Sequence, residues 1–100
     1  MTTSQTLHFV EVDFGKLGKA FVERDPAEMD RKTTLADFRS GQFDKPLRVL
    51  EVIPDEGSCR DVSEDIARDL AAMREPLPRA VIAFIEQHAG IRLALQMEAA

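Results

Sequence analysis

The sequence predicts a single small α+β domain that spans the whole chain. Two short segments rich in apolar and β-branched residues, 7–12 and 47–53, have the composition of strands. Three segments, 26–40, 62–74 and 78–89, carry apolar residues at helical spacing. A chain of 100 residues is the size of one hydrophobic core, so we expect the helices to pack on the strands within one domain.

Both predicted strands end at residues that disfavour further strand. Residues 7–12 (LHFVEV) are followed by Asp13 and two nearby glycines, and residues 47–53 (LRVLEVI) are followed by Pro54. The apolar run in the second segment is nearly continuous and does not alternate. Such a run is typical of a strand buried on both faces.

Capping residues mark where the first two helices begin. The sequence DPAE at residues 25–28 combines an N-cap acid, a proline at the first helical position and an N3 glutamate, which predicts helix 26–40 with Gly41 after its end. The sequence DVSE at residues 61–64 repeats the Asp-x-x-Glu pattern and predicts helix 62–74. On these two helices we expect Phe38 and Leu70 to face the core.

The remaining segments are less regular. Pro78 and Gly90 fit the two ends of helix 78–89. Residues 14–22 have helical spacing of apolar residues and favour a fourth helix, but Gly15 and Gly18 oppose it, and residues 19–23 could instead be extended. Residues 1–6 are polar and predicted to be a flexible lead. Residues 91–100 alternate like a strand but consist of helix formers, and we favour a helical tail.

The charge and composition exclude several function classes. The net charge of −5 and the absence of Trp and Tyr disfavour direct nucleic-acid binding, which needs basic and aromatic side chains. The first residues do not form a basic and apolar leader, and no apolar run is long enough for a membrane span. One cysteine requires no oxidising compartment, so we expect a cytoplasmic protein.

The connection at residues 55–61 is the first candidate ligand site. It lies between a predicted strand and a predicted helix start, where free backbone amides often bind anions. The candidate ligand residues are Gly57, Ser58, Cys59 and Arg60. Neighbouring acids would repel an anion, so we favour capping as the role of this segment and a spectator role for Cys59.

No catalytic or metal-binding motif is present. His8 and His88 are 80 positions apart, which gives no pair of ligands on one helical face. No serine has the surroundings of a nucleophile elbow. We therefore expect neither catalytic residues, nor a metal, nor a cofactor.

The acidity of the chain is local. Residues 51–75 carry eight acidic and three basic residues, which accounts for the whole net charge. On helix 62–74 the outer face is formed by Glu64, Asp65, Arg68 and Asp69. A solvated face is the simplest interpretation, but a concentration of acids can also attract a basic partner protein.

We expect a small, non-enzymatic cytoplasmic interaction or regulatory protein, with the acidic helix face as its speculative partner surface. The alternative is a small-molecule or anion binder, or a minor enzyme, that uses residues 55–61. We also expect a homodimer, because a sheet of two strands is marginal by itself. In this hypothesis, equivalent strand edges pair across a two-fold axis and make a four-stranded sheet. The alternative is a compact monomer in which the tail packs back across the sheet as a helix or a third strand.

Overall fold

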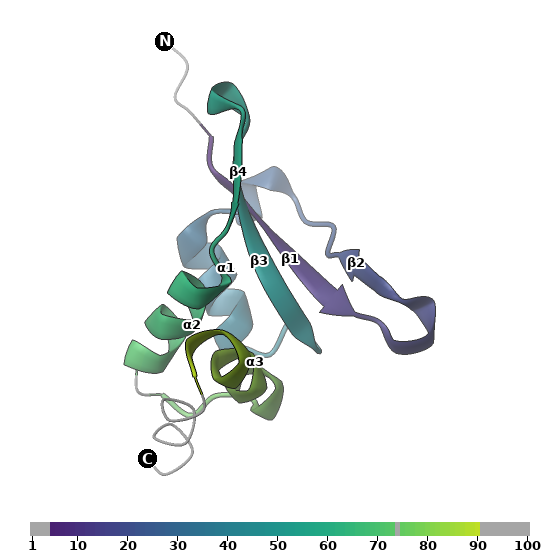
Figure 1. Ribbon diagram of the computed structural model, residues 1–100, viewed down its shortest axis with the longest axis vertical. Helices are drawn as coiled ribbons and strands as arrows, with labels where there is room; N and C mark the ends of the chain where they lie inside the picture. Colours follow the sequence, from purple (N-terminus) through teal and green to yellow (C-terminus); the bar gives the residue numbers. More distant parts are fainter. Residues whose placement is uncertain (1–4, 74, 91–100) are drawn as a thin grey trace.

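A computed structural model describes residues 5–73 and 75–90 of the chain. It confirms the α+β class and contains an antiparallel four-stranded sheet (Figure 1). The strands are β1 (Leu7–Asp13), β2 (Lys19–Phe21), β3 (Pro46–Ile53) and β4 (Ser58–Asp61), and their order in the sheet is β2-β1-β3-β4. The two predicted strands are thus the central pair, with a short strand on each side.

Of the two short edge strands, β4 was not predicted from the sequence, and β2 was predicted only as the extended alternative for residues 19–23. The predicted helix over residues 14–22 is wrong: a 3-10 turn, η1 (Gly15–Leu17), leads into β2. Gly15 and Gly18 have φ angles of 68° and 89°, which a right-handed helix does not permit. The predicted loop over residues 55–61 is instead a second hairpin, in which η3 (Pro54–Glu56) connects β3 to β4.

Strands β2 and β4 remove the reason for which a dimer was predicted, which was a sheet of only two strands. Strand β1 lies between β2 and β3, and β3 lies between β1 and β4. Neither central strand has a free edge. The prediction that these two strands pair with their equivalents in a second protomer is therefore wrong. The sheet reaches four strands within one chain.

Three helices form a layer on one face of the sheet (Figure 1): α1 (Arg31–Arg39), α2 (Ser63–Ala72) and α3 (Arg79–Ala89). The prediction for residues 26–40 is wrong at its start. The Asp25 carboxylate accepts a hydrogen bond from the Ala27 N–H, but it caps only the 3-10 turn η2 (Pro26–Glu28).

The chain changes direction between η2 and α1, at Met29, whose backbone carbonyl bonds β1. The backbone carbonyl of Met29 accepts hydrogen bonds from the N–H and the ring Nδ1 of His8, at 2.8 and 3.0 Å. This oxygen therefore points to β1 and not along a continuous helix. Asp30 caps the new helix start by accepting a hydrogen bond from the Thr33 N–H.

The core lies between the helix layer and one face of the sheet. Phe38 is at its centre, with ring centroids 4.9 Å from Phe43 and 5.0 Å from Phe84. The apolar residues that are at most 2% exposed and line this core are Val10, Val12, Val49, Phe38, Val62, Ile66, Ala67, Leu70, Val81, Phe84 and Ile85. The predicted core positions Phe38 and Leu70 are confirmed.

The start of α2 is joined to the central strand β3. The Val49 N–H donates to the Ser63 Oγ at 2.8 Å, and the Val49 carbonyl accepts from the Val62 N–H at 2.9 Å. These bonds continue the β4 pairing into the first turn of α2. The helix layer is thereby held in place over the sheet. The predicted tail of residues 91–100 and most of the predicted lead of residues 1–6 lie outside the described residues.

We predict that Phe38→Ala and Leu70→Ala each lower the free energy of unfolding by about 2 to 5 kcal/mol, because both side chains are fully buried. Leu17→Ala is the matched control, since Leu17 is 90% exposed; its cost should stay below about 0.5 kcal/mol. Urea unfolding followed by circular dichroism measures all three. A core variant as stable as the control would contradict the assigned core.

Candidate functional site

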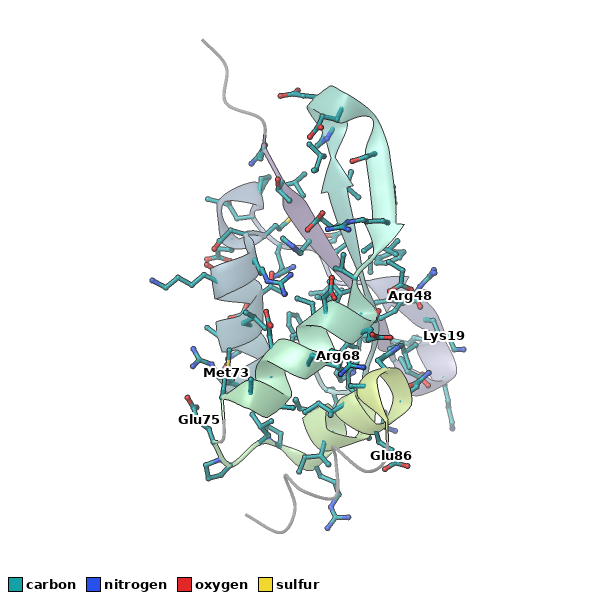
Figure 2. The ribbon with its side chains drawn as sticks, turned by 60° about the vertical axis from the view of Figure 1, so that its left-hand side comes forward. Lys19, Arg48, Arg68, Met73, Glu75 and Glu86 are labelled. Carbon is teal, nitrogen blue, oxygen red and sulfur yellow. The ribbon has the colours of Figure 1, made fainter. Side chains whose placement is uncertain are left out.

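The predicted acidic face of α2 is partly neutralised by arginines. Glu64 pairs with Arg68 one turn later at 3.2 Å, and Asp69 pairs with Arg31 of α1. Figure 2 shows Arg68 on the outer side of the helix layer. Within the described residues, Asp65 alone of the three acids makes no ion pair, so this face attracts a basic partner less strongly than its acid count indicates.

The predicted ligand residues of the 55–61 segment do not converge on one point. Gly57 forms the left-handed turn of the hairpin with φ 62°, and Ser58, Cys59 and Arg60 are exposed in the edge strand β4. Neighbouring strand residues point to opposite faces, so Cys59 is separated from Ser58 and Arg60. Arg60 is paired with Glu51 at 3.1 Å.

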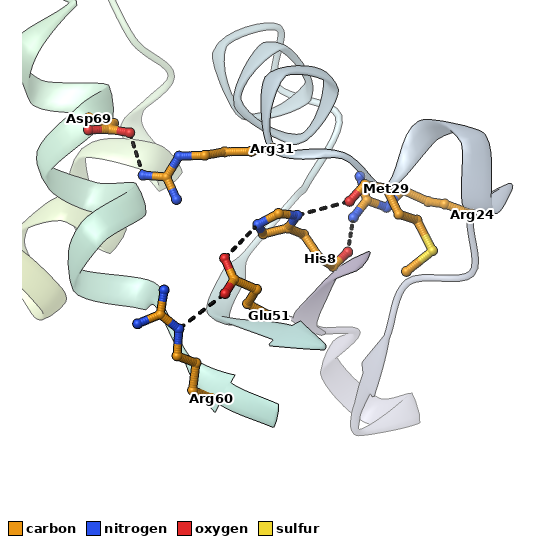
Figure 3. Close-up of polar contacts among 7 residues, drawn as sticks. All are labelled: His8, Arg24, Met29, Arg31, Glu51, Arg60 and Asp69. Atoms are coloured by element: carbon orange, nitrogen blue, oxygen red, sulfur yellow. Dashed lines mark hydrogen bonds and ion pairs between the residues drawn. The ribbon is translucent and has the colours of Figure 1, made fainter. Parts of the chain in front are cut away.

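A polar cluster that the sequence analysis missed surrounds His8 (Figure 3). His8 is 2% exposed and lies opposite Glu51 in the β1–β3 pairing, with its Nε2 3.5 Å from the Glu51 carboxylate. The other carboxylate oxygen of Glu51 accepts from Arg60. The burial of His8 could have been predicted from the sequence, because the alternation of strand residues places His8 on the same face as Val10 and Val12.

This cluster connects segments that are distant in the sequence. Since a carbonyl oxygen only accepts, the contact with Met29 means that the His8 Nδ1 carries the hydrogen. The His8 Nε2 has no hydrogen-bond partner among the described residues. Arg24 donates to the His8 carbonyl. Because the imidazole is closed off from solvent, we interpret the cluster as a structural connection of β1 to β3 and η2.

Asp61 joins the end of β4 to the start of α2. Its carboxylate accepts a hydrogen bond from the Ser63 N–H at 2.8 Å. Partial burial raises the pKa of Asp61, but the hydrogen bonds from Ser63 and the nearby His88 and Arg48 outweigh that effect and lower the pKa below its ordinary value. The ionised carboxylate therefore stabilises this junction.

The second face of the sheet carries apolar side chains that the helix layer does not cover. In the strand pairing Leu7 lies opposite Val52, Phe9 opposite Leu50, and Phe21 beside Phe9 with ring centroids 6.3 Å apart. We call this surface, formed by five side chains, the open face: Leu7, Phe9, Phe21, Leu50 and Val52. All five side chains keep part of their surface accessible, and Phe21 is 37% exposed.

One end of the open face has both an ion pair and exposed apolar groups. Arg48 bonds Glu11 across the strands at 3.0 Å and stacks over the Phe21 ring, 5.6 Å from its centroid. Figure 2 places Arg48 and Lys19 at this end of the sheet. At the adjoining hairpin, Phe14 and Leu17 are 48% and 90% exposed. The hairpin at this end therefore carries exposed apolar side chains as well.

The prediction that residues 47–53 are buried on both faces is wrong within the described chain. Val49 faces the core and is fully buried, whereas Leu50 and Val52 belong to the open face. The composition of β3 is that of a covered strand, yet only one of its faces is covered. The second face of β3 is therefore an apolar surface that the helix layer leaves partly exposed.

Comparison with known proteins does not assign this chain to a family. The chain matches no protein-family model, no curated protein and no solved structure. Within the described residues, no group of three His, Cys, Asp or Glu side chains is placed to hold a metal ion. In the same part of the chain, every helix is too short or too polar to cross a bilayer.

We predict that Asp61→Asn lowers stability at neutral pH and that this loss shrinks on acidification. A pKa lower in the folded than in the unfolded chain means that Asp61 stabilises the fold above the ordinary value of 3.8, and this contribution disappears as the pH falls through the folded pKa. Urea unfolding of both proteins at neutral pH and at about pH 2.5 tests the change. A stability difference that is constant with pH would contradict it.

For Cys59 we predict ordinary chemistry. Cys59→Ser should leave the urea midpoint unchanged, because the side chain is exposed at the sheet edge. In dilute protein the thiol should react with an alkylating agent at the rate of a solvent-exposed cysteine. A rate-against-pH profile with rapid reaction well below neutral pH would instead indicate a reactive site.

Proposed function

We propose that this chain is a small, non-enzymatic interaction or regulatory protein of the cytoplasm, and that a partner protein binds its open face. The observation that carries the proposal is the row of apolar side chains on the uncovered side of the sheet. Antiparallel sheets with one solvated face usually place polar side chains on that face. Here the central strands place Phe9, Leu50 and Val52 on it.

The aromatic pair gives this surface a centre. Phe9 and Phe21 meet edge to face, and the Arg48 guanidinium covers part of the Phe21 ring. Aromatic residues and arginine are enriched where proteins bind each other, because they combine large contact area with polar groups. Contiguous exposed apolar surface on a small protein is itself typical of a binding site.

The acidic face of α2 is the second candidate surface, for a basic partner protein. It is supported by the carboxylate of Asp65, which is exposed and outside the ion pairs described above. A small-molecule or anion site at residues 55–61 has less support. Asp55 and Glu56 stand at the tip of that hairpin, and their charge opposes an anion.

Two variants separate the two surfaces. Phe9→Thr with Phe21→Thr removes the aromatic centre of the open face and keeps residues that favour strands. Asp65→Lys reverses the free charge on α2 and leaves both ion pairs of that face intact. We expect the first variant to lose a stoichiometric partner and the second to retain it.

The measurement is affinity capture with a tagged chain, in cells that also express an untagged copy of it, followed by mass spectrometry. Circular dichroism confirms that both variants are folded. Loss of the partner only in Asp65→Lys would move the interaction to α2. Capture that is unchanged in both variants, or no stoichiometric partner for the unaltered chain, would contradict the proposal.

A further inference from the structure

We propose that the occupant of the open face is a second copy of this chain, packed face to face with its strands antiparallel to those of the first. This inference rests on the proposed function, because it names the partner of the same surface. It is carried by the charges at the two ends of the sheet.

The two hairpin tips have opposite charge. Lys16 lies in the turn between β1 and β2, and Lys19 begins β2. Asp13 ends β1 opposite Lys19, and its carboxylate accepts a hydrogen bond from the Gly15 N–H, so this tip has one excess positive charge. We call it the basic tip. Asp55 and Glu56 form the turn between β3 and β4, which we call the acidic tip. Neither lysine of the basic tip and neither acid of the acidic tip makes an ion pair with another described residue, so both tips are free to attract charges from outside the protomer.

The tips lie at opposite ends of the sheet. Strand β1 runs toward the basic tip, and the antiparallel strand β3 runs toward the acidic tip. Figure 1 shows the β3–β4 turn at the top of the sheet and the β1–β2 turn at its lower right. The open face between them therefore has a basic end, an apolar middle and an acidic end.

A two-fold axis between two such faces has two simple orientations. With the axis along the strands, each tip lies at the same end of the dimer as its equivalent, and like charges share both ends. With the axis across the strands, each basic tip lies at the same end as the partner's acidic tip. Opposite charges favour the second orientation, and the first is opposed by repulsion.

The side chains in the middle of the open face can be buried against the same side chains of a second chain. Arg48 and Glu11 already neutralise each other, so they bring no uncompensated charge into the interface. Leu7, Phe9, Leu50 and Val52 would be covered by the same residues of the second sheet. Stacked sheets lie about 10 Å apart with interdigitated side chains. The apolar composition of β3, unexplained by one protomer, is then that of a strand covered on both faces.

Face-to-face packing also agrees with the short free edges of the sheet. Strand β2 has three residues and β4 has four, and their residues include Lys19 and Arg60. Short, charged edge strands pair poorly with another chain. The face offers the larger apolar surface.

The test uses charge reversal at the tips. The basic-tip variant, Lys16→Glu with Lys19→Glu, and the acidic-tip variant, Asp55→Lys with Glu56→Lys, each place like charges at both ends of the dimer. We expect each to weaken dimerisation by at least about tenfold at low salt. An equimolar mixture of the two should restore the dimer, because each basic end then meets an acidic end again.

The control for the basic-tip variant is Lys32→Glu with Arg79→Glu, which changes the net charge equally. Both residues are exposed on the helix layer, outside ion pairs with described residues, and stand in the first turns of α1 and α3, where acids are tolerated. This control should dimerise like the unaltered chain. Circular dichroism verifies that every variant is folded.

Sedimentation equilibrium over a range of concentrations and salt gives the dissociation constants. For the unaltered chain we expect twice the 11.2 kDa chain mass at the higher concentrations, with weaker association as salt increases. A mass that remains at one chain would overturn the inference. A dimer that is strengthened by salt, or that is insensitive to both tip variants, would overturn the antiparallel arrangement.

The same measurement on Phe9→Thr with Phe21→Thr separates this inference from the proposed function. A dimer unaffected by that variant uses another surface, which overturns the inference. If the unaltered chain is a monomer and the variant loses a different captured protein, the open face is still a binding site and only the choice of partner is wrong. If the chain is a monomer and captures nothing through this face, both proposals fail.

Discussion

The pairing of β1 with β3 is the constraint on which the rest of the structure depends. Val10 lies opposite Val49, and both side chains face the helix layer. A slip of one residue in either strand would turn its buried side chains to the opposite face. With the register as it is, His8 and Glu51 meet on the inner side, while Phe9 and Leu50 meet on the outer side. The buried polar cluster and the open face are therefore two results of one pairing.

The inner side also determines where the helices begin. His8 faces the core side of β1, and both its N–H and its ring bond the Met29 carbonyl, which stops the helical turn that starts at Pro26. Asp30 then provides a second cap for α1. In the neighbouring strand β3, the Val49 backbone holds the first turn of α2 through Ser63 and Val62. Together these contacts between distant segments keep the helix layer on one face, and no helix among the described residues covers the other face.

The outer side of the sheet carries the proposed interaction surface. His8 is buried on the inner side, and the exposed Cys59 is separated from Arg60 by the alternation of β4. The open face instead offers aromatic and aliphatic surface between two oppositely charged hairpins. These are the features by which one protein surface recognises another.

By itself, the sequence determined the α+β class, the two central strands, the three helices and the core positions Phe38 and Leu70, because apolar periodicity and capping residues act over a few neighbouring residues. Only the tertiary structure decided the rest. Strands β2 and β4 are too short to show a pattern, and they form because the long strands β1 and β3 offer them backbone partners. The start of α1 depends on a bond to His8, 21 positions away, which local capping rules do not include. The open face is likewise invisible in the sequence, since which side of a strand a helix covers is settled by packing between distant segments.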